Sequence, residues 1–333
     1  MKRYISIFMI LFSIIIFSGC AKTDNEEDVQ VYDWPLATAS PEDTITQIYA
    51  QKFADEVYRL SDGKMKIRVY SNSILGGDRE LLESCKDGDI PFIVQNTAPQ
   101  VSFMPETAIF DLPSSFDDIE DLRESIDDKK FINLMEDVYK DAGYKLLGFT
   151  DQGFRIMTSN KKVEDISDFK GQKIRTMENS NHINFWKDLG ANPTPMSFSE
   201  VYIGLQQNTI DAQENPYEVV VSSKLYEQQK YLIKTNHLPH VISLISNNDF
   251  YNNLSENQQN IIDEATKIAK EYSRKQCDER IISRMDYIEE NGTEIIELSS
   301  DIKEKIIEAC SDVYEDIKKQ VGNDLVNSYI KEK

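Results

Sequence analysis

Residues 152–160 have the sequence QGFRIMTSN, and residues 169–216 have the sequence FKGQKIRTMENSNHINFWKDLGANPTPMSFSEVYIGLQQNTIDAQENP. Two arginines, Arg155 and Arg175, stand inside the strand-like segments FRIMT and KIRTM. A guanidinium buried in such a segment without an anion would be very costly. Its planar fork of donors fits a carboxylate two bonds at a time. Each arginine therefore holds either a protein side chain, in a structural ion pair, or a ligand.

The start of the chain has the pattern of a secretory signal. Two basic residues precede an apolar run over residues 4–17, and small residues lead to Cys20. A signal at residues 1–19 followed by cysteine predicts a lipoprotein, in which Cys20 receives lipid and becomes the new N-terminus. An uncleaved membrane anchor is the alternative, although the apolar run is shorter than the roughly 20 residues that span a bilayer. Residues 20–30 are expected to form a flexible tether.

The chain is strongly acidic. Its 333 residues carry a formal net charge of −21 at pH 7, which becomes −23 when the signal with Lys2 and Arg3 is removed. This charge argues against nucleic acid, whose phosphates need a basic face. An anion-binding protein of this charge must concentrate positive charge locally, which points to Arg155 and Arg175. The length exceeds what one core usually organises, so we expect two domains.

Strand-like and helix-like segments alternate along the chain. We expect strands at residues 31–38, 65–70, 90–94 and 144–149, and helices at 45–60, 80–86 and 119–142. The alternation predicts an α/β fold with a parallel sheet covered on both faces, in which ligands bind at the carboxyl ends of the strands. The predicted rim of polar and small residues at those ends consists of Ala39, Asn72, Gly76, Gly77, Asp78, Gln95 and Asn96.

A second unit of the same kind begins at Gln152. We expect helices at 165–169, 182–189 and 197–207, a strand at 173–177 and an extended piece at 192–196. The prolines of this extended piece exclude a central strand position. Ser197 with Glu200 predicts a capping box, and residues 211–216 predict a hinge segment. Further helices are expected at 221–232, 255–290 and 300–321; the second is long enough to span both domains or to be kinked.

The remaining cysteines do not form a recognisable framework. With Cys20 assigned to lipid, the odd number left is Cys85, Cys277 and Cys310, and no metal-binding spacing links them. Each lies in a helical pattern and is expected to be a small buried residue. A single bridge between Cys277 and Cys310 stays open.

No group of residues in the sequence assembles a reaction centre. The three histidines are His182, His237 and His240, and Pro239 spoils a helical metal site between the last two. Glu200 and Glu214 lie near the arginines, which would lower their pKa and make them poor general acids. Binding without turnover and without a cofactor is therefore the favoured class of function.

The motifs GFR, DFKGQKIR, GANPTPMSFSEVYIGLQQ and DAQENP occur in the order and spacing of one known family. With GKMKIRVYSNSILGGDRELLESCKDGDI upstream and TNH at 235–237 downstream, the chain resembles the solute-binding proteins of tripartite ATP-independent periplasmic (TRAP) transporters. The resemblance implies two αβ domains with a hinge and a long connecting helix, of the periplasmic-binding-protein type. It also implies a carboxylate ligand, such as a sugar acid or a dicarboxylate, and delivery to a small and a large membrane subunit.

The resemblance also implies roles for individual residues. Arg175 would pair with the ligand carboxylate, Arg155 would give a second cationic contact, and Asn215 an amide donor. Phe198 would form an apolar wall, and His237 would orient the carboxylate-binding network. The rest of the solute would be read from the first domain by Asp78, Gln95 and Asn96. Asn96 stands where sialic-acid binders have an acidic residue, and the Ala39 region lacks their amide, so sialic acid is in doubt.

These observations define the expected organisation. We expect domain I at 31–151 plus about 241–280, and domain II at 152–240 plus about 281–333. The protein would lie outside the cytoplasm, held at the cell membrane through lipid on Cys20. Two other functions stay open: a binding component of an ATP-driven importer or a sensor, and a lipoprotein enzyme acting on acidic sugars.

Overall fold

The computed structural model describes residues 31–330. The predicted signal, the tether and the lipidation site Cys20 lie outside these residues. Within them, no helix combines the length and the apolar character needed to cross a bilayer.

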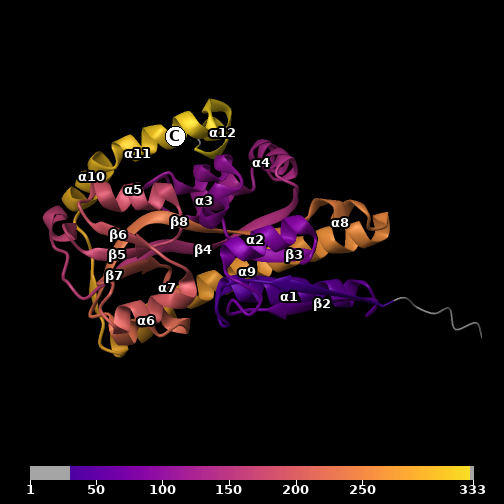
Figure 1. The fold of residues 1–333 in the computed structure, drawn as a ribbon, viewed down its shortest axis with the longest axis horizontal. Coiled ribbons are helices and arrows are strands. Elements are labelled where there is room, and N and C mark those ends of the chain that lie inside the picture. The colour runs from indigo at the N-terminus through magenta and orange to yellow at the C-terminus, as the bar shows by residue number, and fades with distance from the viewer. Residues whose placement is uncertain (1–30, 331–333) are drawn as a thin grey trace, which may run out of the picture. The chain divides into compact units, whose positions relative to one another are not determined.

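The described residues form a nine-stranded sheet with helices on its faces (Figure 1). The strand order is β2-β1-β3-β8-β4-β7-β5-β6, and β9 pairs with β8. The strands are β1 Tyr32–Ala37, β2 Met65–Tyr70, β3 Phe92–Asn96, β4 Tyr144–Ser159, β5 Lys173–Thr176, β6 Asn192–Pro195, β7 Ala212–Asn215, β8 Tyr231–Asn247 and β9 Glu294–Ile296. The prediction of an α/β fold of two αβ units is confirmed.

The sheet is mixed, and the prediction that it is parallel was wrong for its centre. β1 pairs in parallel with β2 and β3, and β5 with β6 and β7. The long strands β4 and β8 run antiparallel to each other and to their outer neighbours. Residues 231–247 are almost entirely buried and form β8, so the helix predicted at 221–232 is wrong. Two pieces take its place, α7 Tyr217–Ser222 and a 3₁₀ turn Leu225–Gln228.

The first half of the sheet carries the elements expected of it. Its helices are α1 Ile45–Leu60, α2 Asp78–Asp87, α3 Ile119–Ile126 and α4 Lys129–Asp141, and α8 Asn248–Asn252 follows β8. Two 3₁₀ turns, Ala98–Ser102 and Pro105–Asp111, connect β3 to α3. Helix α1 begins at the cap Thr44, whose hydroxyl accepts from the backbone N–H of Gln47, and its apolar stripe packs on the sheet.

The second half contains α5 Ser180–Asp188, α6 Val201–Gln206 and 3₁₀ turns at Ile166–Phe169 and Phe198–Glu200. Strand β6 is the edge strand of the sheet, as its two prolines require. The predicted capping box at Ser197 is wrong, because the Ser197 side chain accepts no cap hydrogen bond and the chain turns once before α6 begins. Residues 212–215 form strand β7, paired with both β4 and β5, and the hinge role of this segment stays a prediction.

Helix α9, Glu256–Glu290, connects the two halves as the predicted strut. It begins with a capping box at Ser255 and Gln258. Its first part packs on α1 through Ile262 and Ala269, and its last part inserts Ile288 among the apolar residues of α6 and α7. The same helix is therefore part of both cores.

The C-terminal segment returns to the first half. The helix predicted at 300–321 breaks at Cys310 into α10 Ser300–Ala309 and α11 Ser311–Val321, and α12 Asn323–Tyr329 follows. In Figure 1 these yellow helices run from beside α5 towards α3 and α4. Tyr329 packs on Phe131 of α4 in the cluster of the first half. This packing differs from the predicted division, which assigned residues 281–333 to domain II.

The three described cysteines are free and buried. Cys277 belongs to the apolar cluster under α1, and Cys310 to the cluster under α5. They lie in different cores, so the bridge left open between them does not form.

Candidate functional site

A hollow with two adjoining chambers lies between the halves. An inner and an outer chamber are distinguished by the residues that line them. Both are lined by Asp78, Arg175, Met177 and Phe198. The inner chamber also contains Ala39, Asn96, Asn215 and His240. Of the predicted ligand-binding residues, the structure thus brings five together here: Arg175, Asn215, Phe198, Asp78 and Asn96.

Arg175 is buried in the wall between the two chambers. It stands on β5 opposite Thr194 of β6 and Gln213 of β7, and only 2% of the residue is exposed. Its Nε and Nη2 donate to the carbonyl oxygen of Met196, at 3.1 and 2.8 Å. The ring of Phe198 lies 5.9 Å from the guanidinium carbon. Strand pairing and the Met196 carbonyl therefore fix the plane of the guanidinium.

The Arg175 cation has no anionic partner in the described part of the chain, where it forms hydrogen bonds but no ion pair. Burial lowers the pKa of Arg175 to about 10, and Arg155 adds to this effect while Glu214 and Asp78 oppose it. At neutral pH the guanidinium is still a cation. It is buried, and the N–H groups of its end-on edge form no hydrogen bond with the described residues. Such a group favours binding of an anion.

Arg155 has its anion inside the protein. Its Nε and Nη2 donate to the two carboxylate oxygens of Glu214, and Nη2 also contacts the Glu214 carbonyl at 2.7 Å. The remaining nitrogen, Nη1, lies 2.6 Å from Nδ1 of His240. Arg155 lines neither chamber and is 1% exposed. Its guanidinium forms the structural ion pair that the sequence left as an alternative, and the second cationic contact with the ligand that the resemblance implies stays a prediction.

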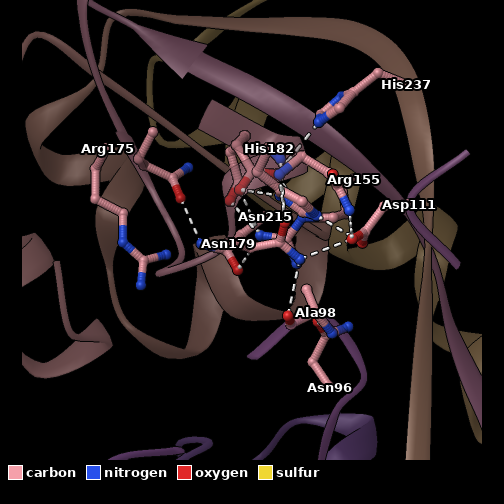
Figure 2. Close-up of polar contacts among 12 residues, drawn as sticks. Asn96, Ala98, Asp111, Arg155, Arg175, Asn179, His182, Asn215 and His237 are labelled. Carbon is pink, nitrogen blue, oxygen red and sulfur yellow. Dashed lines mark hydrogen bonds and ion pairs between the residues drawn. The ribbon is translucent and has the colours of Figure 1, made fainter. Parts of the chain in front are cut away.

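Glu214 is the centre of a buried polar network. Figure 2 shows its partners Arg155, His182 and His237. Burial alone would raise its pKa, but Arg155, His182 and His237 hold the pKa of the carboxyl well below its ordinary value. His237 donates from Nε2 to Glu214 at 3.2 Å and stacks on Phe185, with the ring centres 5.1 Å apart. His237 lines neither chamber, so its contact with the site runs through Glu214.

His182 and Asn179 join the network to the first half of the structure. Nε2 of His182 lies 3.1 Å from Asp111, and Nδ1 lies 3.7 Å from Glu214. Burial would lower the pKa of His182, but the two carboxylates raise it to about 9. Asn179 donates to the Ala98 carbonyl at 2.8 Å and to Asp111 at 2.7 Å. The N-terminal turn of α5 is thereby bonded across to the two 3₁₀ turns.

Among residues 31–330, Asp78 is the only acidic residue that lines the inner chamber. Its carboxylate has no hydrogen bond or ion pair with other described residues. Although part of it faces the chambers, the surrounding atoms shield it from bulk water, and burial raises its pKa to about 6. Arg175 opposes this effect and Glu80 adds to it. Asp78 is therefore an unused acceptor close to a buried cation.

Gln95 and Asn96 are separated by the structure. Gln95 is fully buried, lines neither chamber, and has no hydrogen-bond partner for its amide oxygen or nitrogen within residues 31–330. Asn96 lines the inner chamber, and its amide is anchored to Ala98 N at 2.9 Å and to Val241 O at 3.0 Å. Side chains alternate along a strand, so neighbours on β3 cannot both face the solute.

Sequence reasoning missed His240. It considered this residue only as a metal ligand and rejected it because Pro239 spoils a helical metal site, and it did not recognise β8 as a strand. In the structure His240 is 5% exposed and lines the inner chamber. The buried run VISLIS that follows it was the available signal for a strand.

The arrangement suits binding. The inner chamber presents one buried cation, one carboxylate and amide and imidazole groups from the described residues, on an apolar wall of Phe198, Met177 and Val219. Within residues 31–330, no set of three His, Cys, Asp or Glu side chains is placed to hold a metal ion. Convergent polar groups in a mostly apolar cavity are typical of a small-molecule site.

Comparisons with known proteins agree with this description. The profile of the family described as bacterial extracellular solute-binding protein, family 7, matches residues 36–320. A solute-binding protein of Verminephrobacter eiseniae is 34% identical over 272 residues, which cover 81% of this chain and 80% of the relative.

Two solved structures are similar over most of their length. The sugar acid binding protein of Advenella mimigardefordensis in complex with galactonate is 30% identical, with a TM-score of 0.86 over 91% of this chain and 98% of that one. A TRAP periplasmic solute binding protein of Sulfurospirillum deleyianum with bound succinate is 29% identical, with a TM-score of 0.86 over 91% and 100%. The chain belongs to family 7 of the bacterial extracellular solute-binding proteins, which bind solutes for TRAP transporters.

Proposed function

We propose that this protein captures a small carboxylate, such as a sugar acid or a related organic acid, and presents it to the membrane subunits of a TRAP transporter. The observation that carries the proposal is Arg175, a buried cation that lines both chambers and has no ionic partner among the described residues. Galactonate and succinate, the ligands of the two similar structures, both carry a carboxylate.

The carboxylate would bind Arg175 end-on. Met196 occupies the edge formed by Nε and Nη2, which leaves Nη1 and the second hydrogen of Nη2. These two N–H groups point in parallel and match the two oxygens of a carboxylate. The solute would lie in the plane that Met196 imposes on the guanidinium.

Capture would be coupled to closure of two lobes, with the predicted domains I and II as the moving bodies and with α11 and α12 moving with domain I. Ala39, Asp78 and Asn96 line the inner chamber from the first half, and Arg175 and Asn215 from the second. A solute that contacts both sets favours the closed form only through contacts that are absent when the lobes are apart.

We propose further that the protein is a lipoprotein outside the cytoplasm, held at the membrane by lipid on Cys20. The support is the sequence pattern of residues 1–20 and the family, whose members are extracellular. Mass spectrometry of protein from the membrane fraction should detect lipid on Cys20. The Cys20→Ala variant should be lost from that fraction.

The binding test is a thermal-shift screen of sugar acids, dicarboxylates, keto acids and amino acids, followed by calorimetry. A ligand at about 100 times its Kd adds about 2.7 kcal/mol of stability. Arg175→Ala should weaken binding at least about 100-fold, and Arg175→Lys should restore only part of it because the fork is lost. Arg68→Ala, on the exposed strand β2, is the control. Unchanged affinity in Arg175→Ala would show that the site is elsewhere.

A further inference from the structure

His240 faces the inner chamber from β8, on the side of Arg155. Its Nδ1 lies 2.6 Å from Nη1 of Arg155, and this is its one hydrogen bond within residues 31–330. Nε2 is not among the sealed polar atoms that lack a partner, although the residue is 95% buried. Since His240 lines the chamber, Nε2 is open to it.

The contact with Arg155 determines which ring nitrogen carries the hydrogen. A guanidinium has only donors, so Nδ1 of His240 must accept and cannot be protonated. The hydrogen of the neutral ring is then on Nε2. Burial and the positive charge of Arg155 both lower the pKa of His240 well below its ordinary value, in agreement with a neutral ring. Arg155 itself cannot turn away, because Glu214 holds its other edge.

Asn215 is oriented by the same arginine. Its Oδ1 accepts from Nη2 of Arg155 at 3.2 Å, and its Nδ2 donates one hydrogen to Gln213 at 2.6 Å. The direction of the amide is fixed, because a guanidinium can bond only to the oxygen. One N–H of Asn215 remains for the chamber.

Asn96 follows the same rule on the opposite half. Its Oδ1 accepts from the backbone N–H of Ala98, and its Nδ2 donates one hydrogen to the carbonyl of Val241. Again the oxygen is used within the protein and one N–H is left. Besides Ser40, three neutral polar side chains thus line the inner chamber, and each is oriented by the protein so that one N–H is left for it.

A solute thus meets these N–H donors, the Ser40 hydroxyl and a single carboxylate, Asp78, among the described residues. Oxygen atoms of hydroxyl or carbonyl groups satisfy such donors. A hydroxyl group can in addition donate to Asp78. Because Glu214 balances Arg155, the net positive charge facing the solute is that of Arg175, which suits one carboxylate.

We propose that His240 is a specificity-determining residue, whose Nε2–H, fixed by Arg155, selects monocarboxylates that carry hydroxyl or carbonyl oxygens over acids that lack them. The inference rests on the proposed function and deepens it. It also gives the Arg155–Glu214 pair a positioning role, since the pair sets the donor pattern of the chamber.

Nuclear magnetic resonance of protein labelled with ¹⁵N in its three histidines tests, without any ligand, which ring nitrogen of His240 carries the hydrogen. The signal that is missing in His240→Gln assigns the residue. We expect Nδ1 of His240 to be unprotonated and Nε2 to carry hydrogen at pH 7. A protonated Nδ1 would overturn the proposal whatever the protein binds.

Calorimetry tests whether His240 selects acids that carry hydroxyl groups. Galactonate and erythronate are the hydroxylated probes, and hexanoate and butanoate are their hydroxyl-free counterparts. His240→Phe should weaken binding of the hydroxylated acids about tenfold, which is the effect of one hydrogen bond, and leave binding of the other two acids unchanged. His240→Gln, whose oxygen can accept from Arg155 while its N–H faces the chamber, should recover most of the loss.

The outcomes separate this inference from the proposed function. Equal affinity of His240→Phe and wild type for the hydroxylated acids, or a preference of the wild type for hexanoate, would overturn the inference and leave Arg175 as the carboxylate site. If none of the four acids binds and Arg175→Ala behaves as wild type in the wider screen, both fail.

Discussion

The two carboxylate oxygens of Glu214 receive Nε and Nη2 of Arg155, and neither side chain has more than 1% of its surface exposed. The pair lies between the inner chamber and the buried histidines, and it separates the roles of the two arginines. Arg155 is neutralised within the protein. Arg175, with no such partner among the described residues, keeps its charge for a solute.

Removing Glu214 should be costly. In Glu214→Ala the Arg155 cation is left buried without a partner, so the free energy of unfolding should fall by about 3–5 kcal/mol. Guanidinium unfolding of the ligand-free protein measures this. Asp33→Asn breaks the exposed pair with Arg68 and should cost less than about 1 kcal/mol. A loss in Glu214→Ala no larger than that of the control would contradict the account.

His182 should make stability depend on pH. Its pKa is raised to about 9 in the folded protein, from about 6.5 when unfolded, so the folded state binds its proton more tightly. The stabilisation is complete below about pH 6.5 and is lost as the pH rises through 9, with a size on the order of 3 kcal/mol. Denaturant unfolding between pH 6 and 10 should show this decline in the wild type and not in His182→Asn. If the free energies of unfolding of the wild type and His182→Asn changed in parallel with pH, this role of His182 would be refuted.

Asp43 should slow the release of solute. It precedes α1 and accepts from Arg280 at 2.7 Å and Arg284 at 2.5 Å, and both arginines also donate to Glu218 of α7. The two arginines of α9 thus tie the halves together beside the chamber. Asp43→Asn should raise the dissociation rate about threefold, since an exposed ion pair contributes less than about 1 kcal/mol. Stopped-flow release in this variant, compared with Asp33→Asn, is the measurement; equal rates would exclude the role.

Gly153 should resist substitution more than Gly171. Both have φ of +73°, which favours glycine. Gly153 lies at a register shift of β4, where an added Cβ would approach Ile281 of α9 to 3.3 Å, whereas nothing lies within 4 Å at Gly171. Gly171→Ala should cost about 1 kcal/mol for strain alone, and Gly153→Ala about 2 kcal/mol or more. Thermal unfolding of both variants tests the difference, and equal losses would show that Ile281 yields freely.

Much of the fold followed from local patterns. Helix α9 was predictable because Ser255 and Gln258 mark its start and a helical pattern continues without glycine or proline. Strand β6 was placed at an edge by its prolines. Strand β8 was missed because Pro239 and the polar residues around it interrupt the alternation, and only pairing with β3 and β4 makes them a strand.

The site was less predictable, for a physical reason. Arg155 and Arg175 stand in similar segments, and what distinguishes them is a carboxylate 59 residues after the first one. The local sequence does not show that Glu214 lies next to Arg155 in space. Gln95 and Asn96 show the reverse case, because alternation along β3 could have excluded one of the two. His240 needed both the strand and the arginine before its donor could be recognised.

The path of the chain has a consequence for modularity. It passes between the halves along β4, returns along β8, crosses again in α9, and ends in the first half with α11 and α12. Neither half is a contiguous piece of polypeptide, so no single cut in the gene yields a fragment that contains one whole core. Exchange of one half between relatives would require several simultaneous crossovers, and new specificities are therefore expected to arise by point substitution around the chamber.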